Sequence, residues 1–532
     1  MPKTDAVEVP DVSFPEEPAA DRGVAEGERQ GEGQGQGEGE GEGAPERRRR
    51  VPTALWVVPV FCGATALVAL YYWPGQLDPD TIDAIDQASS GHYNDLHSPL
   101  LSALWRVPYM LGVTSPGWVM AATVFTLLLG LYLVLRVRFG PIVSTVVALV
   151  CLAWPPVLSW GIHVGRDTWF VALLLAAFGF AARLVRMGRP QRWFNLVASL
   201  ACAFLCAASW QIALVPLAVL FVVLAAHLLP RMRGRRLVAV GAAVVTCLAV
   251  YGVQQGLLAA LHTASKYPQQ STYVYDLAQL SKAEHKDLIP PQLRVKGRPT
   301  FAVIENEVKV GTYDPLVFGP GRVILFGLDA RQESILQHAW TTAVTGDLGG
   351  YLKERADLLW AQLAITEPSF WTWQSHPDPR GYQPLDGGLH ADGLQWLENF
   401  SAGGNLRGDA MYDVWAYLLV STLSIPYLLW RRRGADGVVA ALGVAMLVFT
   451  VALFFTTPAL LYRFAYPIVV VGTVTLPVLV PRRRGARRGD EGEPARHEDA
   501  DAEATVSAGE EAPAPPPAPV AEALPAAPVD AG

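Results

Sequence analysis

Apolar stretches of roughly 17–20 residues recur along this chain, and a helix of that length crosses the hydrocarbon core of a bilayer. Ten spans are predicted, at residues 51–73, 117–136, 141–160, 168–184, 193–209, 212–229, 237–256, 412–430, 437–455 and 462–480. Only 17% of the 532 residues are charged and 51% are hydrophobic, which excludes a string of charge-covered soluble domains. The chain is therefore expected to be an all-α polytopic membrane protein with about ten transmembrane helices.

Arginine clusters lie between these spans and predict how the chain is oriented. They occur at 47–50, 136/138, 183–192, 231–236, 431–433 and 482–488. With ten spans, every cluster falls on one side of the membrane, which the positive-inside rule assigns to the cytoplasm. We therefore expect a multi-pass protein of the cell membrane with both termini in the cytoplasm. The net charge of −7 gives no support for nucleic acid as a partner.

Five regions follow from this pattern. Residues 1–50 (acidic and Gly-rich) and 481–532 (Ala/Pro/Glu-rich) are expected to be disordered cytoplasmic tails. Residues 51–256 form a membrane domain with seven helices, residues 257–411 an extracytoplasmic loop domain, and residues 412–480 a membrane domain with three helices. The loop domain is predicted to be mixed α/β, with a strand at 298–310 and an amphipathic helix at 351–365.

All five cysteines (Cys62, Cys151, Cys202, Cys206 and Cys247) fall inside apolar runs. Neither disulfides nor a cysteine metal site are expected from such positions.

The first predicted outer loop is strongly acidic, reading LDPDTIDAIDQASSGHYNDLHSPLLSAL over residues 77–104. Asp78 followed by proline predicts a helix start, and Gly91 predicts its end. On that helix, Asp80, Asp83 and Gln87 share one face by their i, i+3 and i+4 spacing. The segment after Gly91 adds Asp95 and His97 before a short apolar helix at 100–111.

Clustered carboxylates beside low-dielectric surroundings raise one another's pKa, and one of them can then act as a general base near neutral pH. They can also bind a divalent cation through oxygen ligands. A structural explanation stays open for each of them, because acids cap helices and keep outer loops hydrated.

Three motifs resemble the GT-C superfamily of integral-membrane glycosyltransferases. The first is Asp80-Thr81, Gly91 and His97-Ser98-Pro99-Leu100; the second is Arg166-Asp167; the third is LYRFAYP at 461–467. The plan of about ten spans with enlarged outer loops is similar as well, so that the resemblance covers residues 51–480.

This resemblance implies transfer of a sugar from a polyprenyl-phosphate donor to an acceptor in the cell envelope, in some members with Mg or Mn. It assigns Asp80 as the base, Asp83 as its partner and Asp167 as a second acid. Arg166 and Arg463 are expected to bind the donor phosphate, since a guanidinium holds phosphate oxygens in a bidentate fork. His97, Asp95 and Gln87 are expected to contact substrate.

Structural roles remain open for the same residues. Arg166 and Asp167 suit a local salt bridge at the start of a span, Arg463 suits an interfacial anchor, and His97 suits an ordinary loop histidine. The tryptophans of the loop domain suit core packing, the membrane interface or stacking on sugars; they are Trp340, Trp360, Trp371, Trp373 and Trp396.

Two other functions compete with sugar transfer. A transporter or flippase of a lipid-linked saccharide needs a polar path through the spans, and no span carries Asp, Glu, Lys or Arg near its middle. A non-catalytic envelope scaffold would use the two tails to recruit partners.

Overall fold

The computed structural model describes residues 54–186, 189–229, 234–366, 380–400, 408–431 and 434–480. Within these ranges every regular element is a helix, and the extended backbone makes only isolated bridges. By its contacts the chain divides between Val58 and Pro59, inside the first helix, and every interaction below belongs to the larger unit that starts at Pro59. Both predicted tails, together with Trp371 and Trp373, lie outside the described residues.

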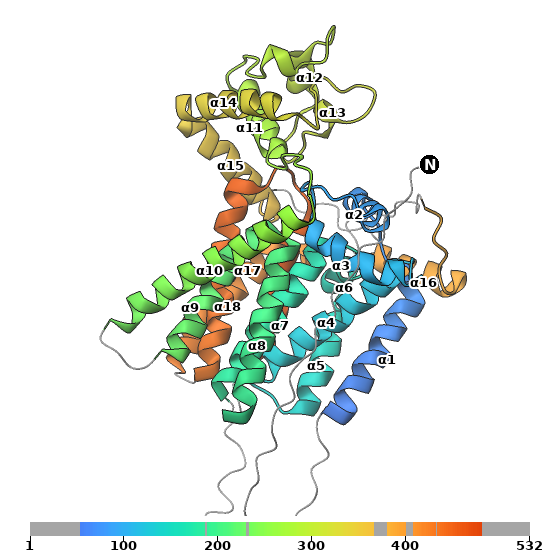
Figure 1. The fold of residues 1–532 in the computed structure, drawn as a ribbon, viewed down its shortest axis with the longest axis vertical. Coiled ribbons are helices and arrows are strands. Elements are labelled where there is room, and N and C mark those ends of the chain that lie inside the picture. Colours follow the sequence, from blue (N-terminus) through green and yellow to red (C-terminus); the bar gives the residue numbers. More distant parts are fainter. Residues whose placement is uncertain are drawn as a thin grey trace, which may run out of the picture. The chain divides into compact units, whose positions relative to one another are not determined.

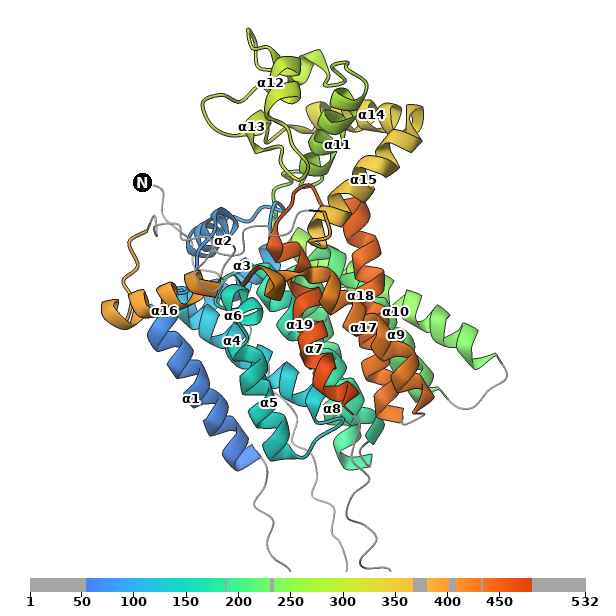
Figure 2. The ribbon, with the colours of Figure 1, turned by 180° about the vertical axis from the view of Figure 1, so that it is seen from behind.

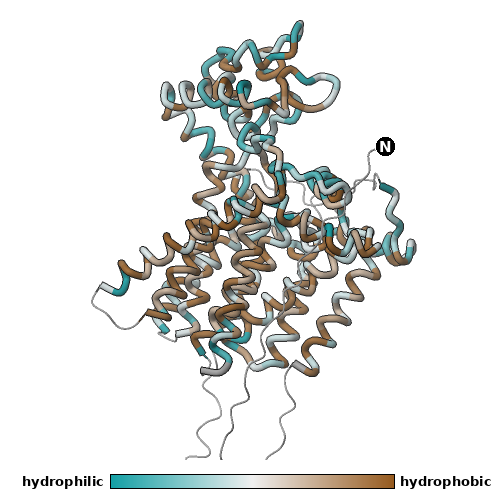
Figure 3. The backbone as a smooth tube through the Cα atoms, viewed as in Figure 1, coloured by the Kyte–Doolittle hydropathy of each residue, from teal (hydrophilic) through white to brown (hydrophobic). Residues whose placement is uncertain are grey.

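Eight of the described helices are long and apolar enough to cross a membrane. They are α1 (Ala54–Tyr72), α4 (Gly117–Leu135), α7 (Arg166–Arg186), α8 (Arg189–Ser209), α9 (Leu214–Leu228) together with the short helical turn Gln211–Ala213 before it, α10 (Arg235–Ala260), α18 (Gly434–Thr456) and α19 (Tyr462–Leu479). Apolar residues predominate along them in Figure 3. The chain is a multi-pass membrane protein.

The other two predicted spans also fall on apolar helices, of which one is broken by a bend and the other is shorter. Residues 141–160 form α5 (Pro141–Ala153) and α6 (Pro155–Gly161), which meet at a 73° bend and count as a ninth span if they cross together. Pro155 and Pro156 cause the break, because proline lacks the amide hydrogen that would continue a helix. The tenth is α17 (Val414–Trp430), an apolar helix of 17 residues.

Helix α7 lies among other membrane helices, packing against α4, α8, α18 and α19. Its side chains Phe170, Leu174 and Ala177 are fully buried. In the view of Figure 2, α17, α18 and α19 lie side by side. Gly472 of α19 allows the close approach of α17, since a Cβ there would lie 2.6 Å from the Cβ of Tyr417. Small residues at such contacts are typical of membrane helix pairs.

The loop segment between α10 and α17 contains only helices and irregular chain among its described residues. Its helices are α11 (Gln270–Ala283), α12 (Thr300–Glu307), α13 (Asp314–Val317), α14 (Ala330–Gly346), α15 (Leu348–Gln362) and α16 (Gly387–Phe400), shown in Figure 1. We call residues 261–366 the loop domain. It has its own apolar core, which includes Val274, Leu316 and Leu336.

The predicted strand at 298–310, and with it the mixed α/β loop domain, is wrong. Residues 300–307 form helix α12. The residues of this stretch that pack into the core are Thr300, Val303, Ile304 and Val308. Their spacing of three and four is the helical period, whereas a strand would bury alternate residues. The predicted amphipathic helix at 351–365 corresponds to α15.

A buried ion pair joins two helices of the loop domain. Arg355 of α15 lies 2.6 Å from the carboxylate of Asp276 of α11, with side-chain exposures of 0% and 3%. The indole of Trp340 donates a hydrogen bond to the same carboxylate. Tyr275-Asp276 and Trp340 therefore serve the internal packing of this domain.

The turn that leads into α19 is held by the loop domain at several points. Arg355 donates to the carbonyl oxygen of Thr457 at 2.6 Å. The amide side chain of Gln362 makes two hydrogen bonds to the backbone of Leu461, donating at 2.8 Å and accepting at 3.3 Å. The backbone of Leu460 donates to Gly311. The start of α19, and with it Arg463, is thereby tied to the loop domain.

Candidate functional site

Helix α2 (Pro79–Ser90) begins and ends where the sequence predicts. Asp78 caps it by accepting a hydrogen bond from the backbone of Thr81, and Gly91 ends it in the left-handed conformation (φ 77°). Helix α3 (Pro99–Met110) then packs against it. Arg106 of α3 donates to the carbonyl oxygens of Ala88 and Ser89, the last turn of α2. The two helices therefore present the acidic face of α2 in a fixed orientation.

Backbone hydrogen bonds join the segment before α2 to the segment before α7. Gln76 donates to Ile162 at 3.1 Å and accepts from Val164 at 3.0 Å. The hydroxyl of Thr81 donates to the carbonyl oxygen of Val164. This pairing places the start of α2 beside Arg166 and Asp167, although the two motifs lie more than 80 residues apart in the sequence.

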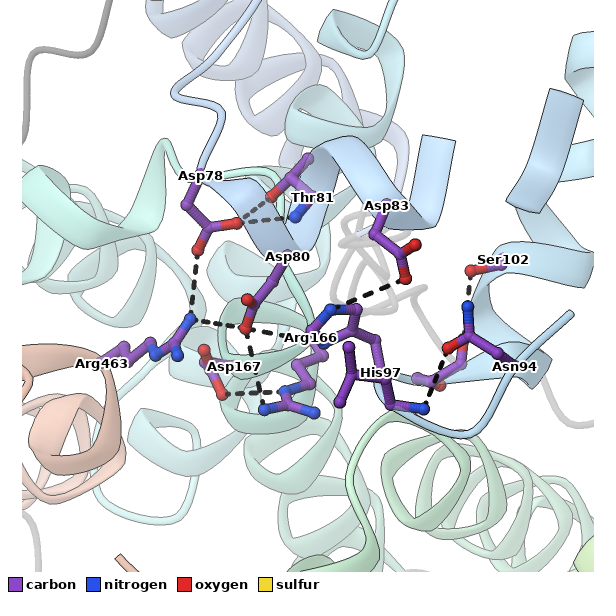
Figure 4. Close-up of polar contacts among 12 residues, drawn as sticks. Asp78, Asp80, Thr81, Asp83, Asn94, His97, Ser102, Arg166, Asp167 and Arg463 are labelled. Atoms are coloured by element: carbon purple, nitrogen blue, oxygen red, sulfur yellow. Dashed lines mark hydrogen bonds and ion pairs between the residues drawn. The ribbon is translucent and has the colours of Figure 1, made fainter. Parts of the chain in front are cut away.

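Arg463, the second residue of α19, completes a cluster of charged side chains. Its Nη1 lies 2.7 Å from Oδ2 of Asp80 and 3.4 Å from Oδ2 of Asp78. Nη2 of Arg166 lies 3.9 Å from the same Asp80 oxygen, and Nε of Arg166 lies 3.9 Å from Oδ1 of Asp167. Figure 4 shows these side chains pointing toward one another from α2, α7 and α19. We call this set of residues the charged cluster.

His97 lies between the carboxylates of Asp80 and Asp83 on α2. Its Nδ1 is 3.6 Å from Oδ2 of Asp80 and its Nε2 is 3.6 Å from Oδ2 of Asp83. Gln87 donates a hydrogen bond of 2.6 Å to Asp83 and accepts one from the backbone of Asn94. Gln87 thus holds Asp83 in place and connects α2 to the chain that carries His97.

The expected elevation of carboxylate pKa is wrong for Asp80. Burial alone raises the pKa of Asp80, but the guanidinium group of Arg463, with His97 and Arg166, more than offsets this, and the pKa lies well below its ordinary value. Burial lowers the pKa of His97; the charges of Arg166 and Arg463 lower it further, against the opposing effect of Asp80 and Asp83. At neutral pH, Asp80 is ionised and His97 is neutral.

A small pocket opens at the charged cluster, lined by Asp78, Asp80, His97, Arg166, Asp167 and the apolar side chains of Ala84, Leu101 and Trp105. Its volume of ≈ 20 Å³ holds about one water molecule, so a sugar needs side chains to move apart. Four buried polar atoms in this region have no hydrogen-bond partner among the described residues: Nδ1 of His97, Nε of Arg166, Oδ1 of Asp167 and Nε of Arg463. Such atoms are uncommon in folded proteins and call for a polar ligand or water.

Among the predicted substrate contacts, Asp95 lies apart from the cluster. Its carboxylate accepts hydrogen bonds from the hydroxyl of Ser265 and the backbone of Lys266, so it fixes the chain that follows α10. Arg166 also packs over the indole of Trp210, 5.9 Å from the ring centroid. Trp210 precedes the short turn Gln211–Ala213 that separates α8 from α9, where the sequence predicts a break.

Three residues in the cluster or close to it were not predicted as site residues. Asp78 is both a helix cap and a partner of Arg463. Tyr313 and Asp314 of the loop domain are close enough that the charge of Arg463 affects both: burial raises the pKa of each, and Arg463 opposes that rise. The sequence Tyr-Asp-Pro-Leu around them is typical of many turns, so it does not predict that these residues lie near Arg463.

The carboxylates do not fit a divalent cation as they are arranged. Two guanidinium groups lie against Asp80, and a cation there would meet their repulsion. Among the described residues, no group of three or more His, Cys, Asp or Glu could hold a metal ion. The cysteines, all of them described, are free thiols.

No family model, no curated protein and no solved structure matches the chain. The functional argument therefore depends on the charged cluster itself.

Proposed function

We propose that this protein is a membrane glycosyltransferase that moves a sugar from a polyprenyl-phosphate donor to an acceptor at the membrane surface beside α2. The arginine distribution predicts that this surface faces away from the cytoplasm. The observation that carries the proposal is the meeting of a carboxylate, a neutral imidazole and two guanidinium groups at the end of apolar helices. A lipid-linked substrate reaches such a place with its phosphate at headgroup depth and its tail in the bilayer.

Arg463 and Arg166 supply the phosphate site. A guanidinium keeps its charge in a low-dielectric setting and matches phosphate oxygens in a bidentate fork. During transfer, the bond between the sugar C1 and the phosphate oxygen breaks, and charge develops on the departing polyprenyl phosphate. Both arginines are positioned to stabilise that charge.

Asp80 changes its role when the donor binds. In the structure it neutralises Arg463, and its low pKa makes it a weak base. A donor phosphate competes for the same guanidinium group, and Asp80 then loses the interaction that lowers its pKa. The acceptor hydroxyl attacks C1 and passes its proton to Asp80, or to His97, which is neutral and lies 3.6 Å away. Asp83 and Gln87 orient His97 through the contacts described above.

Asp167 forms an ion pair with Arg166 and thereby orients its guanidinium group. No step of this mechanism depends on Mg or Mn. Metal dependence is tested separately by measuring transfer in the presence of a chelator.

The test uses the purified full-length protein in lipid, radiolabelled polyprenyl-phosphate hexoses and pentoses, and an envelope glycolipid fraction as acceptor. We expect transfer from one donor, and a loss of about 10²–10⁴-fold for Asp80→Asn, the usual contribution of a general base. Asp86→Asn is the matched control, because Asp86 is on the same helix with its side chain 58% exposed and contacts Arg380. Full activity of Asp80→Asn would exclude its role as base, and saccharide flux into proteoliposomes without a transfer product would indicate a transporter.

A further inference from the structure

A second cavity lies at the opposite ends of the membrane helices from α2. The turn between α4 and α5, the end of α7 and the start of α18 surround it, and α2 lies beyond the other ends of the membrane helices in Figure 2. Its volume is ≈ 480 Å³, within the range of ligand sites in proteins. We call it the arginine cavity, because Arg136, Arg138 and Arg186 line it, with Asp436 as the only acid in its lining.

The one acid in the lining does not balance this charge, since it already has a partner. Asp436 is 3.4 Å from Nε of Arg431, and the two side chains are 3% and 13% exposed. Arg138 donates to the backbone of Val480 and is buried, so it serves as part of the wall. The positive charge available to a ligand comes from Arg136 and Arg186.

Within the described part of the chain, the side chains of Arg136 and Arg186 hydrogen-bond to backbone carbonyl oxygens. Arg136 donates to Phe139, and Arg186 donates to Arg136 and Val137. Each uses a single nitrogen, Nη1, of a guanidinium group that carries five N–H donors. For neither of them does the described part of the chain supply a carboxylate within ion-pair distance. Several charged donors therefore remain for a ligand that enters the cavity.

Two helices also begin at this cavity. Helix α5 starts at Pro141 and α18 starts at Gly434, and the lining includes both residues. The amino ends of helices carry partial positive charge and free amide groups, which favour anions. The amino ends of these helices and the guanidinium groups thus both favour an anionic ligand.

We propose that the arginine cavity binds a phosphate group. Two guanidinium forks and two helix amino ends suit the tetrahedral oxygens of a phosphate. The cavity lies at the ends of apolar spans, at the depth where anionic lipids present their headgroups. The phosphate comes either from such a headgroup or from a soluble phosphate, and the chemistry of recognition is the same. This site is independent of sugar transfer at the charged cluster.

The experiment titrates the full-length protein in detergent with phosphatidylglycerol, with phosphatidylcholine and with inorganic phosphate, and follows bound species by native mass spectrometry. We expect the wild type to bind phosphatidylglycerol or inorganic phosphate at least tenfold more tightly than the double variant Arg136→Gln/Arg186→Gln, since hydrogen bonds to charged groups are the stronger class. Arg236→Gln is the control, because Arg236 is an exposed arginine at the start of α10 outside the cavity.

The pattern of binding separates the two sources. Displacement of phosphatidylglycerol by millimolar phosphate, or binding of phosphate alone, assigns a soluble ligand; tight phosphatidylglycerol binding that phosphate does not displace assigns a lipid. If the double variant fails to fold, Arg136→Gln alone is used, because the side chain of Arg136 hydrogen-bonds to Phe139 within its own turn. Equal binding by the wild type and the variants, or an equal loss in Arg236→Gln, would overturn the proposal.

Discussion

Arg355→Met tests how the loop domain is held together, and it needs no assumption about activity. The substitution keeps much of the side-chain length but removes the charge beside Asp276. At 2.6 Å, the attraction of the two charges is about 6 kcal/mol at an effective dielectric constant near 20, and desolvation offsets part of it. Removing one partner of a buried pair costs about 3–5 kcal/mol, because the other charge stays buried. The bond to Thr457 is lost as well.

The assay is hydrogen exchange of the full-length protein followed by mass spectrometry. A loss of that size raises the population of locally opened α11 by roughly 10²-fold or more, and exchange of its amides should accelerate accordingly. Lys353→Met is the matched control, since Lys353 is on the same helix with its side chain 71% exposed. Its exchange rates should match those of the wild type.

The pH dependence of the stability loss tests whether the buried charge of Asp276 causes it. Burial raises the pKa of Asp276, and Arg355, together with the hydrogen bond from Trp340, opposes that rise. The variant leaves only the hydrogen bond from Trp340 to oppose burial, so the pKa of Asp276 should rise further. A carboxyl with a raised folded-state pKa contributes stability below its unfolded pKa near 3.9, and this contribution is lost as the pH rises through the folded value. The deficit of Arg355→Met should therefore be smaller at pH 5 than at pH 7.5. Equal deficits at both pH values would refute the reasoning.

Three further substitutions test the site and the membrane packing. As the pH is lowered past 6.5, the ordinary pKa of histidine, the transfer rate of the wild type should at first stay constant. It should fall only when the pH drops through the lowered pKa of His97, and His97→Gln should remove that fall. An unchanged pH profile in the variant would show that His97 does not titrate in catalysis. Arg463→Lys keeps the charge without the fork, so the KM for the donor should rise about tenfold or more while the KM for the acceptor stays the same; equal effects on both would argue against a phosphate contact. Gly472→Ala places a methyl group against Tyr417 and should lower stability by about 1–3 kcal/mol in thermal unfolding in detergent, whereas Gly252→Ala in α10, with nothing within 4 Å, should not.

The membrane helices could be predicted because their signal is local. Length and hydropathy locate eight of the ten predicted spans on long apolar helices, and the capping residues Asp78 and Gly91 locate α2 to within a residue. The loop domain could not be predicted in the same way. The sequence of its short helix α12 also suits a strand, because in a stretch of about ten residues a few apolar side chains fit either period.

Four residues of the charged cluster were predicted as site residues (Asp80, Arg166, Asp167 and Arg463), but Asp78 was not, and neither was the protonation behaviour of Asp80. Its sequence neighbours are acids, which favour a raised pKa. Its closest partner in space is Arg463, 383 positions away, and this contact reverses the direction. The ion pair between Asp276 and Arg355 was not predicted either. Both residues belong to ordinary helical segments, and only the fold brings them together.

The two hydrogen bonds between Gln362 and Leu461 fix more than the position of a turn: they set the rotational phase of the helix that follows. Each residue of an α-helix advances about 100° around its axis. One residue inserted between Leu461 and Arg463 would turn the guanidinium away from Asp80 by more than a quarter of a circle, with the composition of the cluster unchanged. Variation in length should therefore be tolerated in many connections of this chain, but not in this one.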